Sequence, residues 1–555
     1  MPELFRVTNE SGRFFDDVHP IPREGNKRRK PGKPNGHAPD YPESSGLIVE
    51  NPGRPTIRVL GGLRHRAADE ALEAMHKAGV GFYQRDRQLV RCASMKAKTS
   101  DGNAIEVPVI LPVTAAVLGR VMGCVAEWEK VKADGTPIRI DPPKEVVEQV
   151  AGMAGEWPFP PLTGVIATPT MRPDGTILDR IGYDPPTGLV LISPPPMPAV
   201  SPMPTRHHAE DALDLLCELL VEFPFASDVS RSVALSMILS AVLRGAIPNV
   251  PMHVATAPQP GTGKSYLFDI ASTIATGERC AVISIAPNPE ETEKRLIGAA
   301  LSGQQIISID NVSDMMMGDF LNQVTERPLL QLRPLGTSIP VRVANTFTVF
   351  ANGNNLSAPA DLVRRTLVAR LDADVENPEE RVFDGDPVRA VLADRGKYVA
   401  ACLTIGRAYV SAGYPSPVRP LASFEGWSNL IRSALVWLKM PDPCASMDLA
   451  RAEDPIRAAK AAVFHAWQAA IGLEGLGHAV SEIVEIADQF DEHGFVYPTF
   501  REACMSVAAD RAKAKISPVR LGKWLTSVEN NRISDLKLVV NRANPGRPKW
   551  IMTRR

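Results

Sequence analysis

Residues 258–265 have the sequence Pro-Gln-Pro-Gly-Thr-Gly-Lys-Ser, which combines residue types that bind phosphate. Gly261 and Gly263 allow the backbone to curl so that successive N–H groups face one anion. Lys264 is then placed to reach the β- and γ-phosphates of a nucleotide, and the Ser265 hydroxyl is placed to ligate Mg²⁺. The spacing predicts a phosphate-binding loop for a nucleoside triphosphate and its metal ion.

The residues on either side of this loop give the motif the context that it requires. The apolar run 250–257 is typical of a short buried strand, and 266–276 is typical of a helix. Thr262 and Tyr266 complete the predicted nucleotide-binding set. Pro258 stands where the strict pattern has its first glycine. The alternative is a chance Gly-Lys-Ser in an ordinary loop, and the strand and helix flanks count against it.

A second nucleotide motif is predicted at the end of the apolar run 306–310, whose last residue is Asp310. A buried strand would deliver this carboxylate to the edge of the sheet beside the loop, where it can hold the Mg²⁺ shell. The next residue is Asn311, where many such ATPases carry a glutamate that activates water. The general base therefore stays open, with three candidates that also fit ordinary surface charges: Glu291, Glu293 and Glu326.

Polar side chains follow a third apolar run, which begins at Thr348 and leads into Asn-Gly-Asn-Asn. An amide at a strand end can hydrogen-bond the γ-phosphate or the attacking water. Asn354 is the first choice for this role and Asn352 the second. The alternative is a loop closed by asparagine turns.

Two arginines, Arg364 and Arg365, follow in the run Asp-Leu-Val-Arg-Arg-Thr. Guanidinium groups can stabilise the charge of phosphoryl transfer, in some ATPases from a neighbouring subunit. Adjacent residues on a helix do not face the same way, so a structural salt bridge is expected for one of the two.

The composition of the chain limits how many domains it can have, how it can bind nucleic acid and in which compartment it is expected. The chain has 555 residues, enough for about three or four domains at roughly 150 residues each. The net charge of −1 means that any nucleic-acid surface must be local. Seven scattered cysteines without a Cys-x-x-Cys pair argue for a reducing compartment and against a zinc knuckle. The start of the chain does not read as a signal segment, and the apolar stretch 233–243 is too short to span a bilayer, so a cytoplasmic protein is expected.

Strands that alternate with helices after residue 205 predict an α/β fold with a parallel sheet. A dense proline segment predicts an extended spacer before it. The expected order is a basic, proline-rich arm at 1–54, an N-terminal α+β domain at 55–192, a proline-rich linker at 193–205, a P-loop ATPase domain at 206–385, a helical domain at 386–504 and a basic C-terminal module at 505–555.

The phosphate loop, the Ile-Asp-Asn strand, the Asn-Gly-Asn-Asn-Leu segment and the Asp-Leu-x-Arg-Arg run together resemble the AAA+ part of primase-helicases from prophages and integrative elements, which is similar to superfamily 3 helicases. The resemblance covers about residues 205–440. It implies an AAA+ core, ATP and Mg²⁺ as cofactors, a hexameric or similar ring, and single-stranded or forked DNA as partner. Asp372 and Asp374 suit a helicase strand end, and the chain has no zinc cluster, so primase activity is not implied.

Two basic segments are candidates for DNA contact. Residues 331–345 predict a hairpin with Arg333 and Arg342, and the resemblance implies that such a hairpin enters the pore of a ring. An ordinary surface hairpin is the alternative.

Residues 511–555 carry twelve Lys or Arg against two Asp or Glu. A helix with Arg520 and Lys523, then a hairpin with Arg547 and Lys549, looks like a winged helix; a solubilising tail is the alternative.

These observations favour an ATP-dependent DNA helicase or translocase that acts in replication of a phage or mobile element. A helicase loader is an alternative of the same class. A nucleotide-gated initiator or defence switch with slow hydrolysis belongs to another class, and Asn311 keeps it open.

Overall fold

The structure is a computed structural model, and its described residues are 53–98, 104–286, 288–310, 312, 319–334, 339–354, 360–452, 455–510, 515–542 and 548–554. Of the N-terminal arm expected at 1–54, only residues 53 and 54 are described. Asn311 lies outside the described residues.

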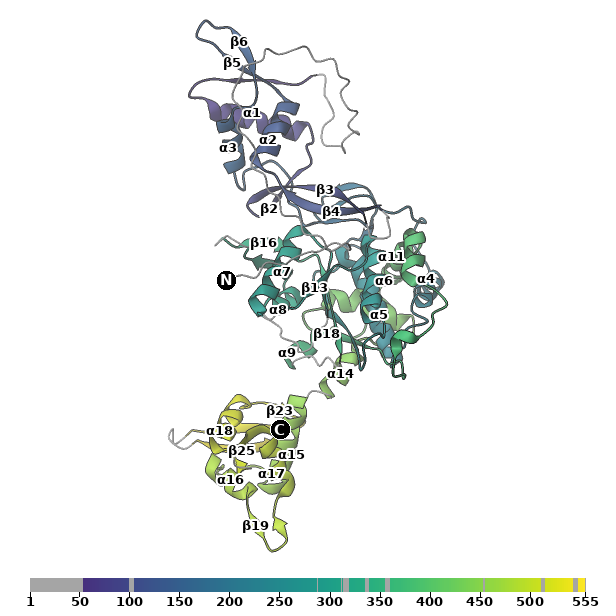
Figure 1. Ribbon diagram of the computed structural model, residues 1–555, viewed down its shortest axis with the longest axis vertical. Helices are drawn as coiled ribbons and strands as arrows, with labels where there is room; N and C mark the ends of the chain where they lie inside the picture. The colour runs from purple at the N-terminus through teal and green to yellow at the C-terminus, as the bar shows by residue number, and fades with distance from the viewer. Residues whose placement is uncertain are drawn as a thin grey trace, which may run out of the picture. The chain divides into compact units, whose positions relative to one another are not determined.

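A five-stranded parallel sheet, shown in Figure 1, lies at the centre of the predicted ATPase region. Its strand order is β13-β14-β17-β12-β18. The strands are β12 (Met252–Ala257), β13 (Val282–Ser284), β14 (Ile306–Asp310), β17 (Thr348–Asn354) and β18 (Thr366–Arg370). All four pairings are parallel, which confirms the predicted mixed α/β class with a parallel sheet.

Helices cover both faces of this sheet, with α5, α6 and α11 on one side and α7 and α8 on the other (Figure 1). Alternate residues of each strand serve the two faces: Phe350 and Leu367 pack with the first group, and Val349 and Val368 with the second. Strands buried on both faces must be apolar throughout, as the sequence runs are. The helices here are α4 (Arg206–Glu218), α5 (Asp228–Val242), α6 (Lys264–Thr276), α7 (Pro289–Ser302), α8 (Asp319–Glu326), α9 (Ala360–Val363), α10 (Pro387–Ala393) and α11 (Arg395–Ser411).

Local signals set the ends of these helices. Ser227 accepts a hydrogen bond from the Ser230 backbone N–H and so begins α5, and Asn288 begins α7 in the same way. The segment Asp228–Ala246 has the length and composition of a membrane-crossing helix, although the apolar stretch had been expected to be too short. It is 72% buried, because it packs between α6, α11 and the sheet.

The residues before the ATPase region form two groups. Helices α1 (Arg64–Lys77), α2 (Ala115–Val125) and α3 (Lys144–Gly152) pack in one apolar cluster with β1 (Thr56–Val59) and β5 (Glu127–Val131), and β6 (Pro137–Ile140) pairs with β5. A second sheet contains β2 (Phe82–Arg85), β3 (Gln88–Lys98) and β4 (Ala104–Pro112). Short strands follow: β7 (Gly164–Ile166), β8 (Thr170–Met171), β9 (Ile177–Leu178), β10 (Gly182–Asp184) and β11 (Leu189–Leu191).

The proline-rich segment 193–205 does not behave as a free spacer. Arg407 of α11 donates a hydrogen bond to the Pro202 carbonyl at 2.8 Å, and Gly396 of α11 lies so close to Pro196 that a side chain there would collide with its carbonyl oxygen. Proline fixes the extended shape as predicted, but the segment is packed along a helix. Thr168 and Thr170 upstream also donate hydrogen bonds to the Ala275 and Val242 carbonyls.

The described residues from 387 to 470 are mainly helical, in agreement with the sequence pattern. Its elements include α12 (Glu425–Trp427), α13 (Ser433–Trp437), α14 (Ala445–Ala452) and α15 (Pro455–Ala470). Residues 463–552 share an apolar cluster of their own. Its elements are α15, α16 (Val480–Ala487), α17 (Pro498–Ala508), α18 (Pro518–Ser527), β23 (Arg532–Ile533), β24 (Leu536–Asn541) and β25 (Lys549–Arg554), with short pairs β19 (Phe490–Asp491) with β20 (Gly494–Phe495) and β21 (Ala509–Asp510) with β22 (Lys515–Ile516).

Candidate nucleotide site

The predicted phosphate loop joins β12 to α6. Gly261 has φ +76° and Gly263 has φ +93°, backbone conformations that side chains strongly disfavour. Gly263 is the residue before the first turn of α6, so the free N–H groups of the helix start open onto the loop. A helix N-terminus with a glycine loop is a site that attracts an anion. The Thr262 side chain is buried beneath it.

Lys264 is the first residue of α6. Its Nζ donates hydrogen bonds to the Gln259 carbonyl at 3.0 Å and to the Thr262 hydroxyl at 3.2 Å. Partial burial lowers the pKa of the Lys264 ammonium, and the nearby Asp310 carboxylate opposes this shift. The ammonium group thus lies folded against the loop that a phosphate would occupy.

Three side chains from different elements meet beside Lys264. The Ser265 hydroxyl of α6 donates to Oδ1 of Asp310 at the end of β14, at 3.4 Å. The Asn352 amide of β17 donates to the same hydroxyl at 3.1 Å. Parallel strands end at the same edge of a sheet, which is why residues so distant in sequence meet here.

The first choice for the amide at this edge was Asn354, and the structure places Asn352 there instead. Asn352 pairs with Ala255 inside the sheet and is buried, while Asn354 is the last residue of β17 and is exposed. The two side chains share a face of the strand. Ala351 pairs with Ile309, the residue before Asp310, so Asn352 lies level with the carboxyl end of β14 and Asn354 lies beyond it. The sequence pattern cannot show how far a strand extends past its neighbour.

One of the two arginines forms a structural salt bridge, as expected, although both lie in the turn between α9 and β18 and not on a helix. Arg365 is buried, and its guanidinium donates to the Glu326 carboxylate at 2.7 Å and to the Asn322 amide oxygen at 3.1 Å. Arg365 is therefore the member of the pair whose side chain is held inside the fold by a salt bridge. The Arg364 side chain is 58% exposed and lies 3.8 Å from Glu326.

This ion pair also bears on the candidates for the general base. Glu326 serves as the partner of Arg365, and Glu291 lies 3.9 Å from Lys294 and 3.8 Å from Arg295 along α7. These ion pairs fit structural or surface roles for Glu326 and Glu291.

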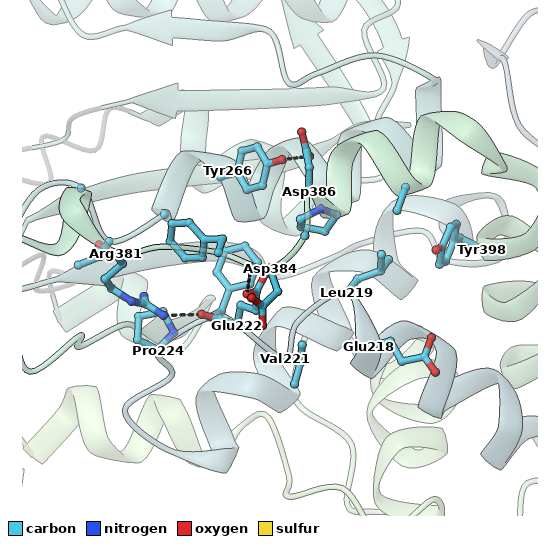
Figure 2. A pocket seen from close by; sticks show the side chains of 18 residues that line it. Glu218, Leu219, Val221, Glu222, Pro224, Tyr266, Arg381, Asp384, Asp386 and Tyr398 are labelled. Atoms are coloured by element: carbon cyan, nitrogen blue, oxygen red, sulfur yellow. Dashed lines mark hydrogen bonds between the residues drawn. The ribbon is translucent and has the colours of Figure 1, made fainter.

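A cavity of about 750 Å³ opens beside the loop and is shown in Figure 2. One wall is Gly261–Gly263 with Tyr266 of α6, and another is the turn 221–224 that follows α4. A third wall belongs to residues 372–386, which connect β18 to α10 and which we call the strap. Phe223, Phe383 and Tyr398 supply aromatic surface.

Hydrogen bonds across the cavity wall join these segments (Figure 2). Tyr266 donates its hydroxyl proton to Asp386, and Arg381 donates to the Glu222 carbonyl at 2.7 Å. Burial, followed by this bond to Asp386, raises the pKa of Tyr266 to about 12, so its hydroxyl stays a donor near neutral pH. Sequence reasoning found Tyr266 but missed residues 218–224 and 381–387, since these segments have no motif and meet only in the fold.

Ser265 and Asp310 together fit a magnesium ion that also binds phosphate oxygens. Mg²⁺ takes few protein ligands, usually a hydroxyl or a carboxylate, and completes its shell with water and phosphate. Among the described residues, no group of three or more His, Cys, Asp or Glu could hold a metal alone.

The predicted DNA-binding residues lie on two surfaces outside the nucleotide site. Strands β15 (Leu329–Leu332) and β16 (Val341–Ala344) form the predicted antiparallel hairpin, with Arg333 and Arg342 exposed.

In the C-terminal module Arg520 and Lys523 are exposed on α18, and Lys549 begins β25. Arg520 also donates to the Ala509 carbonyl. Arg547 lies outside the described residues.

Comparison with known proteins finds solved structures that are similar to this one but have low sequence identity. No protein-family model matches the sequence, and no curated protein matches it. The fold is similar to the C-terminal region of NrS-1 in its apo A form, with TM-score 0.38 and 11% identity over 87% of this chain and 98% of that chain. It is also similar to SCCmec type IV Cch, described as an active helicase, with TM-score 0.33 and 10% identity over 85% of this chain and 97% of that chain.

Proposed function

We propose that this protein is an ATP-dependent DNA helicase or translocase, built on an AAA+ core, that acts in replication of a phage or mobile genetic element. The observation that carries the proposal is the Ser265 hydroxyl, held between Asp310 and Asn352 at the start of α6. A glycine loop, a lysine, a hydroxyl and a carboxylate at one sheet edge are the parts that phosphoryl transfer from a nucleotide requires.

Each residue of this group has a distinct role in the proposed site. Lys264 leaves Gln259 and binds the β- and γ-phosphates, whose charge replaces its contact with the loop. Ser265 and Asp310 would hold Mg²⁺, which when bound would supply positive charge beside the phosphates. Asn352 orients the Ser265 hydroxyl toward the metal and offers its amide to the γ-phosphate or the attacking water.

Assembly into a ring of copies, hexameric or similar, would complete the site. Lys264 lies against the loop of its own chain, and Arg365 is committed to Glu326. Arg364 is exposed and is therefore suited to reach the nucleotide of a neighbouring copy. The rim of the cavity also exposes apolar side chains, with Val382 94% and Val221 73% accessible.

DNA contact is proposed for the hairpin with Arg333 and Arg342 and for a C-terminal winged-helix-like module with Arg520, Lys523 and Lys549. In the module a helix precedes an antiparallel hairpin, and the basic residues are accessible along both. Such contacts go mainly to phosphates and carry little sequence information. A cytoplasmic location fits the seven free cysteines.

A nucleotide-gated initiator, helicase loader or defence switch is the second candidate, and the residue that favours it is Asn311, which follows Asp310 where a water-activating glutamate is common. The two candidates differ in turnover. We expect a motor to hydrolyse ATP faster when forked DNA is added, whereas a switch hydrolyses slowly with or without DNA. ATP turnover at saturating nucleotide, measured over a DNA titration, decides between them.

A further inference from the structure

We propose that a second cleft, at the edge of the parallel sheet opposite the phosphate loop, binds a small organic anion with a carboxylate or phosphate head and a short apolar body. The cleft has a volume of about 440 Å³. The residues that the structure describes around it do not overlap with those around the nucleotide cavity. The proposal therefore goes beyond the proposed function and does not depend on it.

The cleft lies where the strands of the sheet begin. Its floor comes from the segments that lead into β12, β14 and β17. Its opposite wall belongs to residues 163–189, which contain β7 to β10 and lead into β11. Thr168 and Thr170 of this wall donate hydrogen bonds to the carbonyls of Ala275 and Val242, near the ends of α6 and α5. The wall is thus fastened to the ATPase region, and the cleft is formed without a ligand.

The charge of the cleft comes from Arg244. Among the described residues that line the cleft, Arg244 is the only one with a charged side chain. It is half-buried, and burial lowers the pKa of its guanidinium to about 10, so the group stays protonated at neutral pH. In the described part of the chain its hydrogen bonds go to backbone carbonyls and the Asn345 side chain, and none goes to a carboxylate. A cation withdrawn from water without a counter-ion attracts an anion.

Hydrogen-bond donors for that anion are also present. Nε and Nη2 of Arg244 donate to the carbonyls of Phe347 and Asn345 at 3.2 and 2.7 Å, and Nη1 donates one proton to another carbonyl. Nη1 carries two protons, and the second has no acceptor among the described residues. Thr163 and Thr346 line the same cleft, and their hydroxyls make no hydrogen bond within the described structure. The guanidinium and these hydroxyls can therefore donate to one bound head group.

Asp184 is a carboxylate that a lining residue contacts, and it is already paired. It accepts a hydrogen bond from the Thr187 hydroxyl at 2.7 Å and one from the Arg172 guanidinium at 2.8 Å. These bonds, that of Arg172 first, lower the pKa of Asp184. The Arg172 guanidinium balances the charge of Asp184, so this carboxylate does not repel an anion in the cleft.

The remaining lining decides the class of ligand. Ile166, Leu189 and Val242 present apolar side chains to the cleft, beside the hydroxyl and amide groups. A bare inorganic ion would leave these side chains in water, whereas a short hydrocarbon body would cover them. The volume of the cleft lies within the range of small-molecule sites, which combine a mainly apolar lining with a few polar anchors. An organic anion with a short apolar body fits both features.

Isothermal titration calorimetry on the full chain tests the site with hexanoate, hexyl phosphate and neutral 1-hexanol. Saturating tripolyphosphate is present throughout, so that the phosphate loop is occupied. At least one anion should bind at least about 10-fold more tightly than hexanol, the scale of one hydrogen bond to a charged group, and the tighter anion identifies the head group. Arg244→Met should remove this preference. Arg66→Met, which removes an exposed arginine of α1, is the matched control and should keep it.

A second variant keeps the test decisive if Arg244→Met does not fold, since Arg244 also holds loop carbonyls. Ala246 is half-buried and lines the cleft, so Ala246→Phe places a ring in the space of the apolar body and leaves Arg244 in the chain. This variant should lose anion binding. Equal binding of the anions and hexanol, no anion binding by wild-type protein, or anion binding that survives Ala246→Phe would overturn the proposal.

Discussion

The Asn352 side-chain amide donates a hydrogen bond to the Ser265 hydroxyl at 3.1 Å, between residues 87 positions apart in the sequence. Ser265 in turn donates to Asp310, so the end of β17 is linked to the end of β14 through the first turn of α6. A nucleotide bound at the loop would meet all three side chains at once.

Asn352 and Asn354 form a matched pair for testing this link. Asn352→Ala should lower ATP turnover by about 100-fold, the usual scale for losing one positioned donor. Asn354→Ala removes an exposed amide at the end of the same strand and should leave turnover within about twofold of wild type, as surface substitutions usually do. Steady-state phosphate release measures both. If Asn354→Ala lowers ATP turnover more than Asn352→Ala does, Asn354 is the residue that acts on the nucleotide.

Lys264→Ala should abolish ATP hydrolysis, because the phosphates lose the cation borne by the loop. Asp310→Ala should abolish Mg²⁺-dependent turnover while it leaves more of the nucleotide binding. Turnover and fluorescent-nucleotide binding, measured side by side, separate these effects. Undiminished hydrolysis in both variants would remove the basis of the proposed site.

Arg365→Ala and Arg364→Ala should fail in different ways. Loss of Arg365 leaves Glu326 without its buried partner and should cost about 2–3 kcal/mol of stability, less than a fully buried pair because Glu326 is partly exposed. Thermal melting should show this as a lower transition temperature. Arg364→Ala should melt like wild type and bind ATP but not hydrolyse it.

The role of Arg364 between copies has its own test. Mixing Arg364→Ala with Lys264→Ala should restore some turnover, since one mixed interface combines an intact loop with an intact arginine. Light scattering with ATP and DNA should show an assembly. A monomer under these conditions, or no recovery on mixing, contradicts this role.

Lys523→Ala combined with Lys549→Ala should weaken DNA binding and flatten its salt dependence. Each lost phosphate contact lowers the slope of log K against log salt by about 0.9 on duplex DNA. Point changes are preferable to removal of 511–555, because Leu521, Leu536 and Trp550 from that segment are buried in the core of the module. ATP turnover without DNA should be kept. Unchanged affinity across a salt titration would leave the Arg333 and Arg342 hairpin as the DNA contact.

Because the His253 side chain is buried, we expect the folded protein to lose stability in acid. It is buried on β12, its Nε2 lies 3.0 Å from the Ser236 hydroxyl, and burial lowers its pKa to about 3. Because the unfolded chain binds this proton near pH 6.5 and the folded chain does not, stability falls as the pH drops below that value. The loss between pH 7 and pH 5 is about 2 kcal/mol. Melting curves of His253→Gln should be less sensitive to pH over this interval, and parallel curves would contradict the assignment.

Local sequence predicted the parts of the site that one segment determines. The loop glycines, Lys264, Ser265 and the Asp310 strand follow from short motifs, and the alternating pattern predicted the parallel sheet. Asn352 could not be separated from Asn354, because the difference depends on how far β17 extends past β14. The cavity wall at Glu222 and Arg381 depends on contact between segments 159 residues apart, which no local pattern records. The packing of the proline-rich segment on α11 was missed for the same reason.

Strand displacement on forked DNA with ATP and Mg²⁺ tests the central claim most directly. Wild-type protein should separate the strands in an ATP-dependent reaction, and Lys264→Ala should bind the same fork without separating it. ATP hydrolysis that DNA does not stimulate, with no strand displacement by wild-type protein over a range of fork designs, would contradict a helicase.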